Sequence, residues 1–225
     1  MWRVESGECK EKYLPISLIL NQLDTKDMTV ELFDKSNLDI VAAMLDKMWK
    51  KDIFDGIEHS FELSREVVLN MFYSPELALQ ACDDDGKLQA VAFAIMKNDV
   101  NISRQWIEDF LVGKNEDERN RVTEATNYLL RTERYLLRLM SEDSVKFSFL
   151  VSYKHGYAKA LQERLMQMLM DRGVQWTYHI TDSTCSWQYF AHHGFEKVYE
   201  ELVDMFSTTG QPYYCYMYRK HVLNY

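Results

Sequence analysis

The chain has 225 residues with a formal net charge of −9, and 47% of its residues are hydrophobic. It is long enough to bury a core without cross-links, and its acidic balance argues against a general nucleic-acid binder, which needs clustered Lys and Arg. Its 8 glycines and 3 prolines argue against long disordered stretches. We therefore expect a single domain over residues 1–225.

The N-terminal segment and the cysteines indicate the compartment. The first residues, MWRVESGECKEKY, are charged and lack the apolar core of a secretory signal, and no apolar run is long enough to predict a membrane span. The four cysteines have neither C-x-x-C nor zinc spacing: Cys9, Cys82, Cys185 and Cys215. We expect a cytoplasmic protein with reduced thiols, no metal site, and neither nucleic acid nor membrane as partner. A disulfide is the less favoured alternative, and a homodimer stays open.

Along the first third of the chain, residues 1–27 predict no definite element. Residues 28–33 alternate between apolar and polar side chains and predict a strand. A first helix is predicted by apolar residues at helical spacing: Leu38, Val41, Leu45 and Met48. A loop over 51–61 then leads to a second helix from Ser64 to the Ser-Pro pair at 74–75.

The middle of the chain predicts a hairpin followed by a helical insertion. Two apolar runs, 77–82 and 88–96, flank an Asp-Asp-Asp-Gly turn, which is a hairpin signal. Residues 101–142 then predict helix, because Asn115 and Glu118 have capping-box spacing. One apolar face continues through this stretch: Val122, Ala125, Leu129, Leu136 and Met140.

The remaining part predicts alternating strands and helices. The elements are, in order, a strand over 145–151, a helix over 157–172 capped by Gly173, a strand over 174–180, a short helix ending at Gly194, and strands over 195–203 and 213–219. The complete order indicates an α/β fold with a mixed sheet.

The segment 149–161 carries the clearest chemical signal. A strand passes through the loop 153–156 directly into an amphipathic helix, so unpaired backbone N–H groups at the helix N-terminus can hold a phosphate. Gly156 permits close approach of a ligand. Positive charge and donors come from Lys154, His155 and Lys159. The segment has neither a Walker loop nor a dinucleotide fingerprint, and taken alone it equally fits an ordinary strand-to-helix turn.

With the residues that follow it, this segment resembles the GNAT superfamily of acetyl-CoA-dependent N-acetyltransferases. The loop 153–158 (YKHGYA) stands where the family has [Q/R]-x-x-G-x-[G/A]. The pair Gly194-Phe195 matches the family's terminal Gly-Phe, and 213–220 matches its closing strand. The resemblance covers 145–220 most clearly. It implies a GNAT-like mixed, mostly antiparallel sheet flanked by helices, with a helical insertion between the third and fourth strands.

The resemblance also implies an activity, namely direct transfer of an acetyl or other small acyl group from its coenzyme A thioester to an amine. Strand 145–151 would diverge from strand 174–180, and the pantetheine chain of the acyl donor would pair with the exposed edge. Acetyl-CoA would act as a substrate, and no metal is implied. The implied donor-binding residues are Leu150, Val151, Tyr153, Lys154, His155, Gly156, Tyr157, Ala158, Lys159 and Ser186.

Two positions depart from the family pattern. Tyr153 stands where the family has Gln or Arg, and Phe190 stands where many relatives have a tyrosine that acts as general acid. Tyr189 is adjacent, but one residue rotates a side chain by about 100° around a helix. We keep Tyr189 as a candidate acid, and Glu58, in the loop 51–61, as a candidate base acting through water.

These departures leave other functions open. One alternative is a non-catalytic GNAT-like domain that binds a CoA-type ligand or a protein partner. Another is an interaction protein built on the helical stretch 101–142, although this does not explain the loop 153–158. We expect His179, on the strand 174–180, to have a structural role. The sequence does not identify the amine acceptor.

Overall fold

A computed structural model describes residues 2–4, 28–154, 156–184, 187–207 and 211–225. Most of residues 1–27, for which the sequence predicts no definite element, and the proposed donor contacts His155 and Ser186 lie outside these ranges. So do two of the four cysteines, Cys9 and Cys185. The other two, Cys82 and Cys215, are buried and reduced.

The elements follow the predicted order with one strand added at the N-terminus. They are β1 (Trp2–Val4), β2 (Met28–Leu32), α1 (Leu38–Trp49), α2 (Ser60–Val67), β3 (Ala78–Asp83), β4 (Leu88–Met96), α3 (Gln105–Phe110), α4 (Glu116–Leu139), β5 (Ser144–Ser152), α5 (Tyr157–Asp171), β6 (Trp176–Asp182), α6 (Trp187–His192), β7 (Glu196–Leu202) and β8 (Tyr214–His221).

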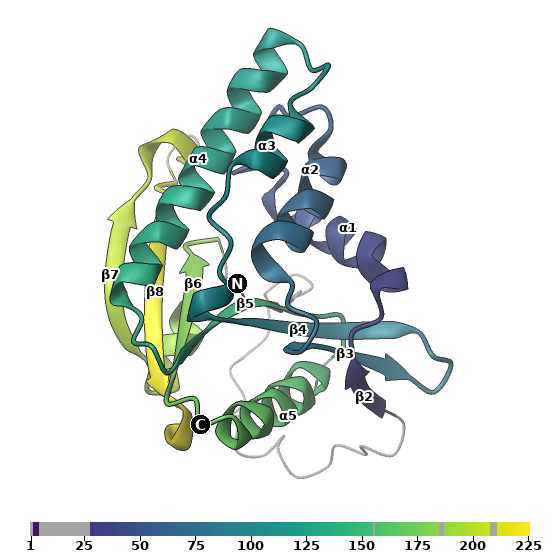
Figure 1. The fold of residues 1–225 in the computed structure, drawn as a ribbon, viewed down its shortest axis with the longest axis vertical. Helices are drawn as coiled ribbons and strands as arrows, with labels where there is room; N and C mark the ends of the chain where they lie inside the picture. Colours follow the sequence, from purple (N-terminus) through teal and green to yellow (C-terminus); the bar gives the residue numbers. More distant parts are fainter. Residues whose placement is uncertain (1, 5–27, 155, 185–186, 208–210) are drawn as a thin grey trace.

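The strands form one sheet in the order β2-β3-β4-β5-β6-β8-β7, with β1 beside β5 (Figure 1). The pairs β5–β6 and β1–β5 are parallel, and the other pairs are antiparallel. A parallel neighbour requires a crossover connection, which α5 supplies between β5 and β6. The predicted mixed, mostly antiparallel sheet is confirmed.

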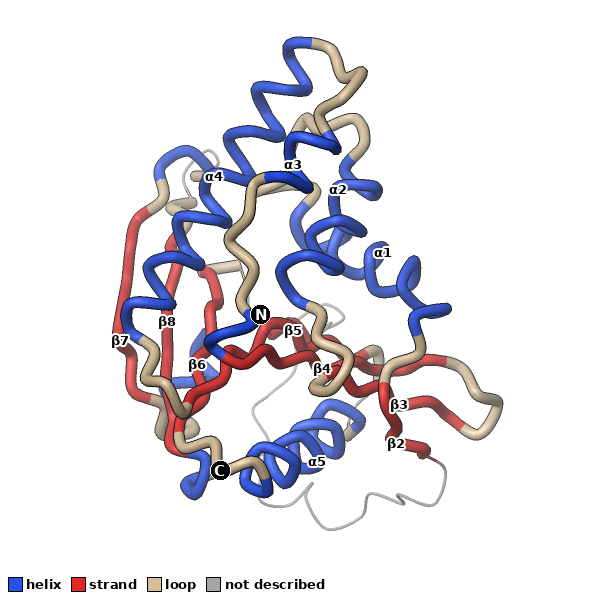
Figure 2. Tube along the Cα trace, in the orientation of Figure 1, coloured by secondary structure: helices blue, strands red, loops and turns tan. Residues whose placement is uncertain are grey.

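Helices cover both faces of the sheet (Figure 2). Helices α1 to α4 lie on one face and α5 lies on the other. Each face has its own buried cluster: Val41, Leu63 and Phe149 belong to the α1–α4 side, and Phe147 and Leu165 belong to the α5 side. No helix in the described ranges combines the length and apolarity that a bilayer crossing requires.

The predicted insertion is part of the core. Val122, Ala125 and Leu130 on α4 are buried in the same cluster as α1 and α2, while Leu136 packs with Tyr178 from β6. Removing residues 101–142 would therefore uncover both groups. Such a deletion would disrupt the fold.

Two boundaries differ from prediction for identifiable reasons. Helix α2 begins at Ser60 rather than Ser64, because the His59 backbone N–H donates to Glu118 Oε1 (3.1 Å), a contact from 59 positions away. Strand β6 begins at Trp176 rather than residue 174. The Val174 N–H instead donates back to the Leu169 carbonyl (3.0 Å) and closes the C-terminus of α5.

Candidate functional site

The two parallel strands in the middle of the sheet separate at a β-bulge. Phe93 and Ala94 of β4 lie opposite Phe149 and Phe147, so Ser148 is an extra residue in β5. The β5–β6 ladder ends at the adjacent pair, Phe147 and His179. A bulge bends its strand away from regular pairing. Ser148 Oγ fixes the bend by donating to the Phe72 carbonyl (2.6 Å).

Beyond Phe147 and His179, β5 and β6 no longer pair, and a gap lies between them. A cavity, here called the chamber, lies on the α1–α4 side of this gap. Its wall comes from α1 and the turn after it, the helical turn 68–72 that follows α2, α4, the middle of β5, the end of β6, and the residue before β8. Apolar and aromatic side chains form most of the wall, including Trp49, Phe72, Tyr128 and Ile180. A mostly apolar cavity with a few polar groups is typical of small-molecule sites.

A buried ion pair forms one side of the chamber. Lys146 on β5 donates to Glu133 on α4, and both side chains are almost fully buried. Lys146 Nζ also donates to the Met71 carbonyl (3.1 Å). Burial lowers the pKa of Lys146, although Glu133 opposes that effect. The ion pair satisfies only one oxygen of the Glu133 carboxylate.

Three polar atoms of the chamber wall have no hydrogen-bond partner among the described residues: Trp49 Nε1, Glu133 Oε2 and Thr181 Oγ1. Asp182, at the end of β6, is also buried and lines the chamber, and its Oδ1 accepts from the Thr184 backbone N–H (2.8 Å). Buried polar groups are normally satisfied, so unsatisfied ones indicate a place where another molecule can form hydrogen bonds.

The predicted donor loop lies at the same end of β5 as the gap. Gly156 has φ +90°, a conformation that favours glycine, and it immediately precedes α5. The Tyr153 N–H donates to the Gln89 carbonyl (2.8 Å), and Ser152 Oγ donates to the Lys154 carbonyl (2.6 Å). These bonds anchor the start of the loop. The end of α5 that presents backbone N–H groups therefore has a fixed position relative to β5.

The other predicted donor contacts are distributed around this loop. Leu150 and Val151 are buried in β5, whereas Tyr153 is exposed. Lys154 is exposed and pairs with Asp83 (3.4 Å), and Lys159 pairs with Glu163 (3.7 Å). The surface beside the loop is therefore not a simple basic patch.

The expected donor edge of β5 already has a neighbour. Strand β1 pairs with it in parallel, and Trp2, Arg3 and Val4 lie opposite 150–152. Because β4 occupies the other edge of β5 over 145–152, β1 lies on the edge that β6 has left. The sequence did not predict this strand.

Tyr189 and Phe190 on α6 lie outside the chamber wall. Phe190 is fully buried and stacks on Tyr218 (4.9 Å between ring centroids). A tyrosine there would need space for a hydroxyl inside a packed core. Tyr189 stacks on His193 (3.9 Å). Burial raises the pKa of Tyr189, and a hydrogen bond with Gln162 of α5 opposes that effect.

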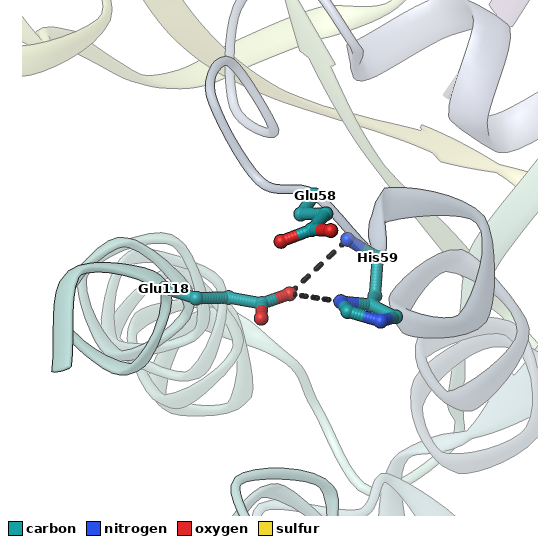
Figure 3. Close-up of side chains that lie close together, drawn as sticks. All are labelled: Glu58, His59 and Glu118. Carbon is teal, nitrogen blue, oxygen red and sulfur yellow. Dashed lines mark hydrogen bonds and ion pairs between the residues drawn. The ribbon is translucent and has the colours of Figure 1, made fainter. Parts of the chain in front are cut away.

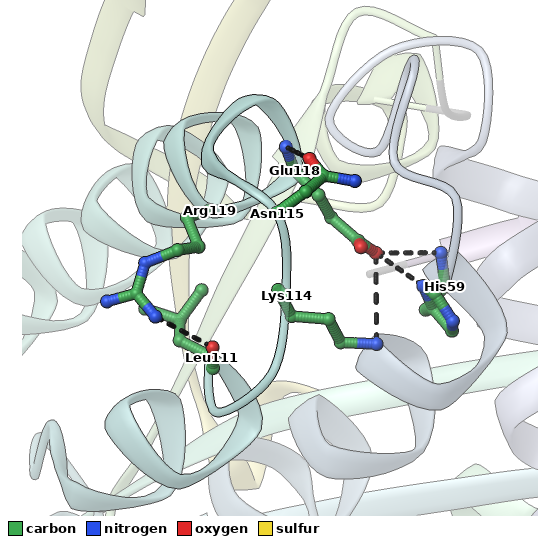
Figure 4. Close-up of polar contacts among 6 residues, drawn as sticks. All are labelled: His59, Leu111, Lys114, Asn115, Glu118 and Arg119. Carbon is green, nitrogen blue, oxygen red and sulfur yellow. Dashed lines mark hydrogen bonds and ion pairs between the residues drawn. The ribbon is translucent and has the colours of Figure 1, made fainter.

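Glu58 belongs to a different cluster, in which it points towards His59 and Glu118 (Figure 3). The ligand atoms of these three residues lie within 4.8 Å of one another. His59 Nδ1 lies 2.6 Å from Glu118 Oε1. Lys114 Nζ lies 3.9 Å from the same oxygen (Figure 4). The Lys114 ammonium therefore supplies a positive charge beside the Glu118 carboxylate.

This cluster acts as a clamp between the starts of α2 and α4. Burial alone would raise the pKa of Glu118, but hydrogen bonds from His59 and the charge of Lys114 lower it below its usual value. Asn115 caps α4 by accepting from the Glu118 N–H (2.9 Å), as predicted. The Glu118 side chain, however, contacts His59 rather than completing the predicted capping box.

Sequence reasoning missed the polar groups of the chamber. Lys146, Glu133, Thr181 and Asp182 come from three separate segments, and no motif joins them. One signal was available: Lys146 is a lone charge inside the apolar run VKFSFLV. A charged residue in a strand predicted to be buried requires a partner. His179 is buried, with Nε2 2.7 Å from the Tyr225 hydroxyl, and it lies outside the chamber wall.

No protein-family model and no curated protein matches the sequence. Solved structures do match. A mosquito arylalkylamine N-acetyltransferase like 5b superposes with a TM-score of 0.55 at 13% identity, covering 86% of this chain and 99% of that chain. Arylalkylamine N-acetyltransferase 2 from Aedes aegypti gives 0.54 at 15% identity, covering 87% and 99%. The polyamine N-acetyltransferase of Drosophila melanogaster gives 0.55 at 11% identity, covering 87% and 100%. The chain has the fold of the GNAT N-acetyltransferases, as its sequence resemblance predicted.

Proposed function

We propose that this protein transfers an acetyl group from acetyl-CoA to the amine of a small molecule. The observation that carries the proposal is the separation of β5 from β6 at Ser148. Beyond this separation, β5 leads into the N-terminus of α5. A chamber with unsatisfied polar groups lies on the sheet face opposite to α5. The similar structures include enzymes named for arylalkylamines and polyamines, which supports an amine acceptor.

In this proposal the acyl donor binds through the backbone. The pantetheine chain pairs with the β5 edge at Leu150 and Val151, and the pyrophosphate lies at the α5 N-terminus, near Gly156 and the backbone N–H groups of 157–159. The first turn of a helix leaves such groups without helical partners. Tyr153, Lys154, Tyr157, Ala158 and Lys159 are the proposed flanking contacts, together with His155 and Ser186.

The amine enters from the chamber and attacks the thioester directly. After the ammonium has lost one proton, its nitrogen lone pair forms a bond to the carbonyl carbon of the thioester. A main-chain N–H near the bulge polarises that carbonyl. The C–S bond then breaks, and the coenzyme A thiolate takes the second proton from nitrogen. Tyr189 and Glu58 stay candidates for proton transfer through water, and the proposal depends on neither.

Two measurements test this function. Calorimetry with CoA should show binding, and a thiol assay with acetyl-CoA should show thiol release that depends on an added primary amine. Absence of CoA binding would contradict the donor site. Binding without release across a broad amine panel would favour the alternative of a non-catalytic CoA-binding domain, which the buried Phe190 in place of a general acid supports.

A further inference from the structure

The charges that line the chamber do not balance. Glu133 and Asp182 bring two carboxylates, and Lys146 brings one ammonium, which leaves one negative charge. All three side chains are buried. Asp182 accepts hydrogen bonds from Thr184 but pairs with no cationic side chain among the described residues, so a bound cation in the chamber would offset the cost of burying this charge.

Two of the three unsatisfied atoms of the chamber can accept a hydrogen bond from the same ligand group, whereas the third, Trp49 Nε1, is an N–H donor. Glu133 Oε2 is a pure acceptor when ionised, and Thr181 Oγ1 can accept as well as donate. A primary ammonium is a donor-only group with several N–H bonds. It can donate to both oxygens at once while supplying the missing positive charge.

The rest of the chamber wall determines which chemical group on the ligand can accompany the ammonium. Trp49, Phe72 and Ile180 give the chamber an apolar or aromatic wall. A second cationic group on the ligand would have to lie against this wall or beside Asp182, which already accepts from Thr184, while a carboxylate would be repelled by Glu133 and Asp182. Both would bind less well than an uncharged apolar group.

We infer that the chamber binds a primary monoamine on an aromatic or branched apolar group, with its ammonium between Glu133 and Thr181. The inference rests on the proposed function and narrows the acceptor class. It excludes polyamines and free amino acids as preferred acceptors. Glu133 and Thr181 are therefore specificity-determining residues contributed by α4 and β6.

Amine binding can be measured separately from catalysis. Calorimetry is performed with 2-phenylethylamine, with and without saturating CoA, and then with 2-phenylethanol, phenylalanine and 1,4-diaminobutane. We expect the first to bind at least about tenfold more tightly than the other three, as expected for loss of a charged hydrogen bond. Equal binding of the diamine or the amino acid would overturn the inference, as would no binding of 2-phenylethylamine.

Two variants assign the binding to the named residues. Glu133→Gln should weaken the binding of 2-phenylethylamine by about tenfold or more. Thr181→Val, which retains the Lys146–Glu133 ion pair, should weaken this binding severalfold. Glu124→Gln, an exposed glutamate on the same helix, is the matched control. Unchanged affinity in Thr181→Val would overturn the inference even if Glu133→Gln does not fold. CoA binding and thiol release, measured in parallel, report failure of the proposed function separately.

A second inference follows from β1. The edge of β5 at 150–152 has one row of backbone groups, and β1 pairs with that row. The proposed pantetheine position uses the same row. Because a strand edge accepts one partner at a time, we propose that β1 competes with the acyl donor, so that the chain restrains its own donor binding. This inference also rests on the proposed function.

Proline substitutions test the competition in the full chain. Arg3→Pro/Val4→Pro removes two backbone donors from β1, and Arg3→Ala/Val4→Ala keeps them. We expect the proline variant to bind CoA at least about threefold more tightly than wild type, and the alanine variant to match wild type. Equal or weaker CoA binding by the proline variant would overturn the competition alone. Absence of CoA binding in all three proteins would overturn the donor site as well.

Discussion

The two sides of the gap between β5 and β6 recognise their proposed ligands by different means. On the α5 side the available groups belong mainly to the backbone, at the β5 edge and at the helix start after Gly156. On the α4 side they are side chains, Glu133, Lys146 and Thr181, brought together from distant segments. The difference shows that the donor side depends on backbone geometry, whereas the acceptor side depends on the tertiary arrangement.

The substitution on the acceptor side with the largest expected effect on stability is Lys146→Met. It leaves the buried Glu133 carboxylate without its ammonium partner, and breaking a buried pair typically costs about 3–5 kcal/mol of unfolding free energy. Urea denaturation measures the loss. The double variant Lys146→Met/Glu133→Leu should recover most of it, because no buried charge then lacks a partner. A single variant as stable as wild type would show that the pair is unimportant to the fold.

Gly156→Val should weaken binding of the acyl donor without affecting binding of the amine. Gly156 immediately precedes the α5 N–H groups that hold the pyrophosphate in the proposal, and φ +90° strains any L-residue. We expect CoA affinity to fall by about a hundredfold, the equivalent of about 2.7 kcal/mol, with 2-phenylethylamine binding retained. Gly173→Val is the control, because it places similar strain (φ +74°) at the other end of α5, where no atom lies within 4 Å. Equal losses in both variants would indicate strain rather than a blocked site.

Phe190→Tyr and Tyr189→Phe distinguish packing from proton transfer on α6. The first forces a hydroxyl into a filled core beside Tyr218 and should lower the unfolding free energy by about 1–3 kcal/mol. The second should reduce turnover by less than about tenfold if Tyr189 only packs. Thermal denaturation and thiol release measure the two effects. A loss of about a hundredfold or more in Tyr189→Phe, with CoA affinity intact, would make Tyr189 the general acid.

The smallest expected effect is a pH dependence of stability caused by His179, the last residue of β6 that pairs with β5. Burial lowers the pKa of His179 well below its usual value, so the unfolded chain takes up a proton below about pH 6.5 that the native state does not. Stability should therefore fall as pH decreases, by about 1.4 kcal/mol between pH 7.5 and 5.5. Urea denaturation of wild type and His179→Asn measures it. The same pH effect in both proteins would exclude His179 as the cause.

The difference between the two sides also explains what the sequence could predict. The loop before α5 was found because a strand, a glycine and a helix are consecutive and obey local rules. The chamber was not found, because Glu133 meets Lys146 only after α4 has packed across the sheet. The start of α2 was misplaced for the same reason, since a side chain from α4 fixes it. Strand β1 was missed because three residues with no pattern of their own pair with a strand far along the chain.

Amide hydrogen exchange with the two ligands tests the two-sided arrangement most directly. We expect CoA to increase protection in 148–159 and to leave the α4 segment around Glu133 unchanged. Addition of 2-phenylethylamine should then increase protection around Glu133 and at 180–182, with little further change in 157–159. If CoA left 148–159 unchanged, or if both ligands protected the same segment, separate donor and acceptor sides would be contradicted.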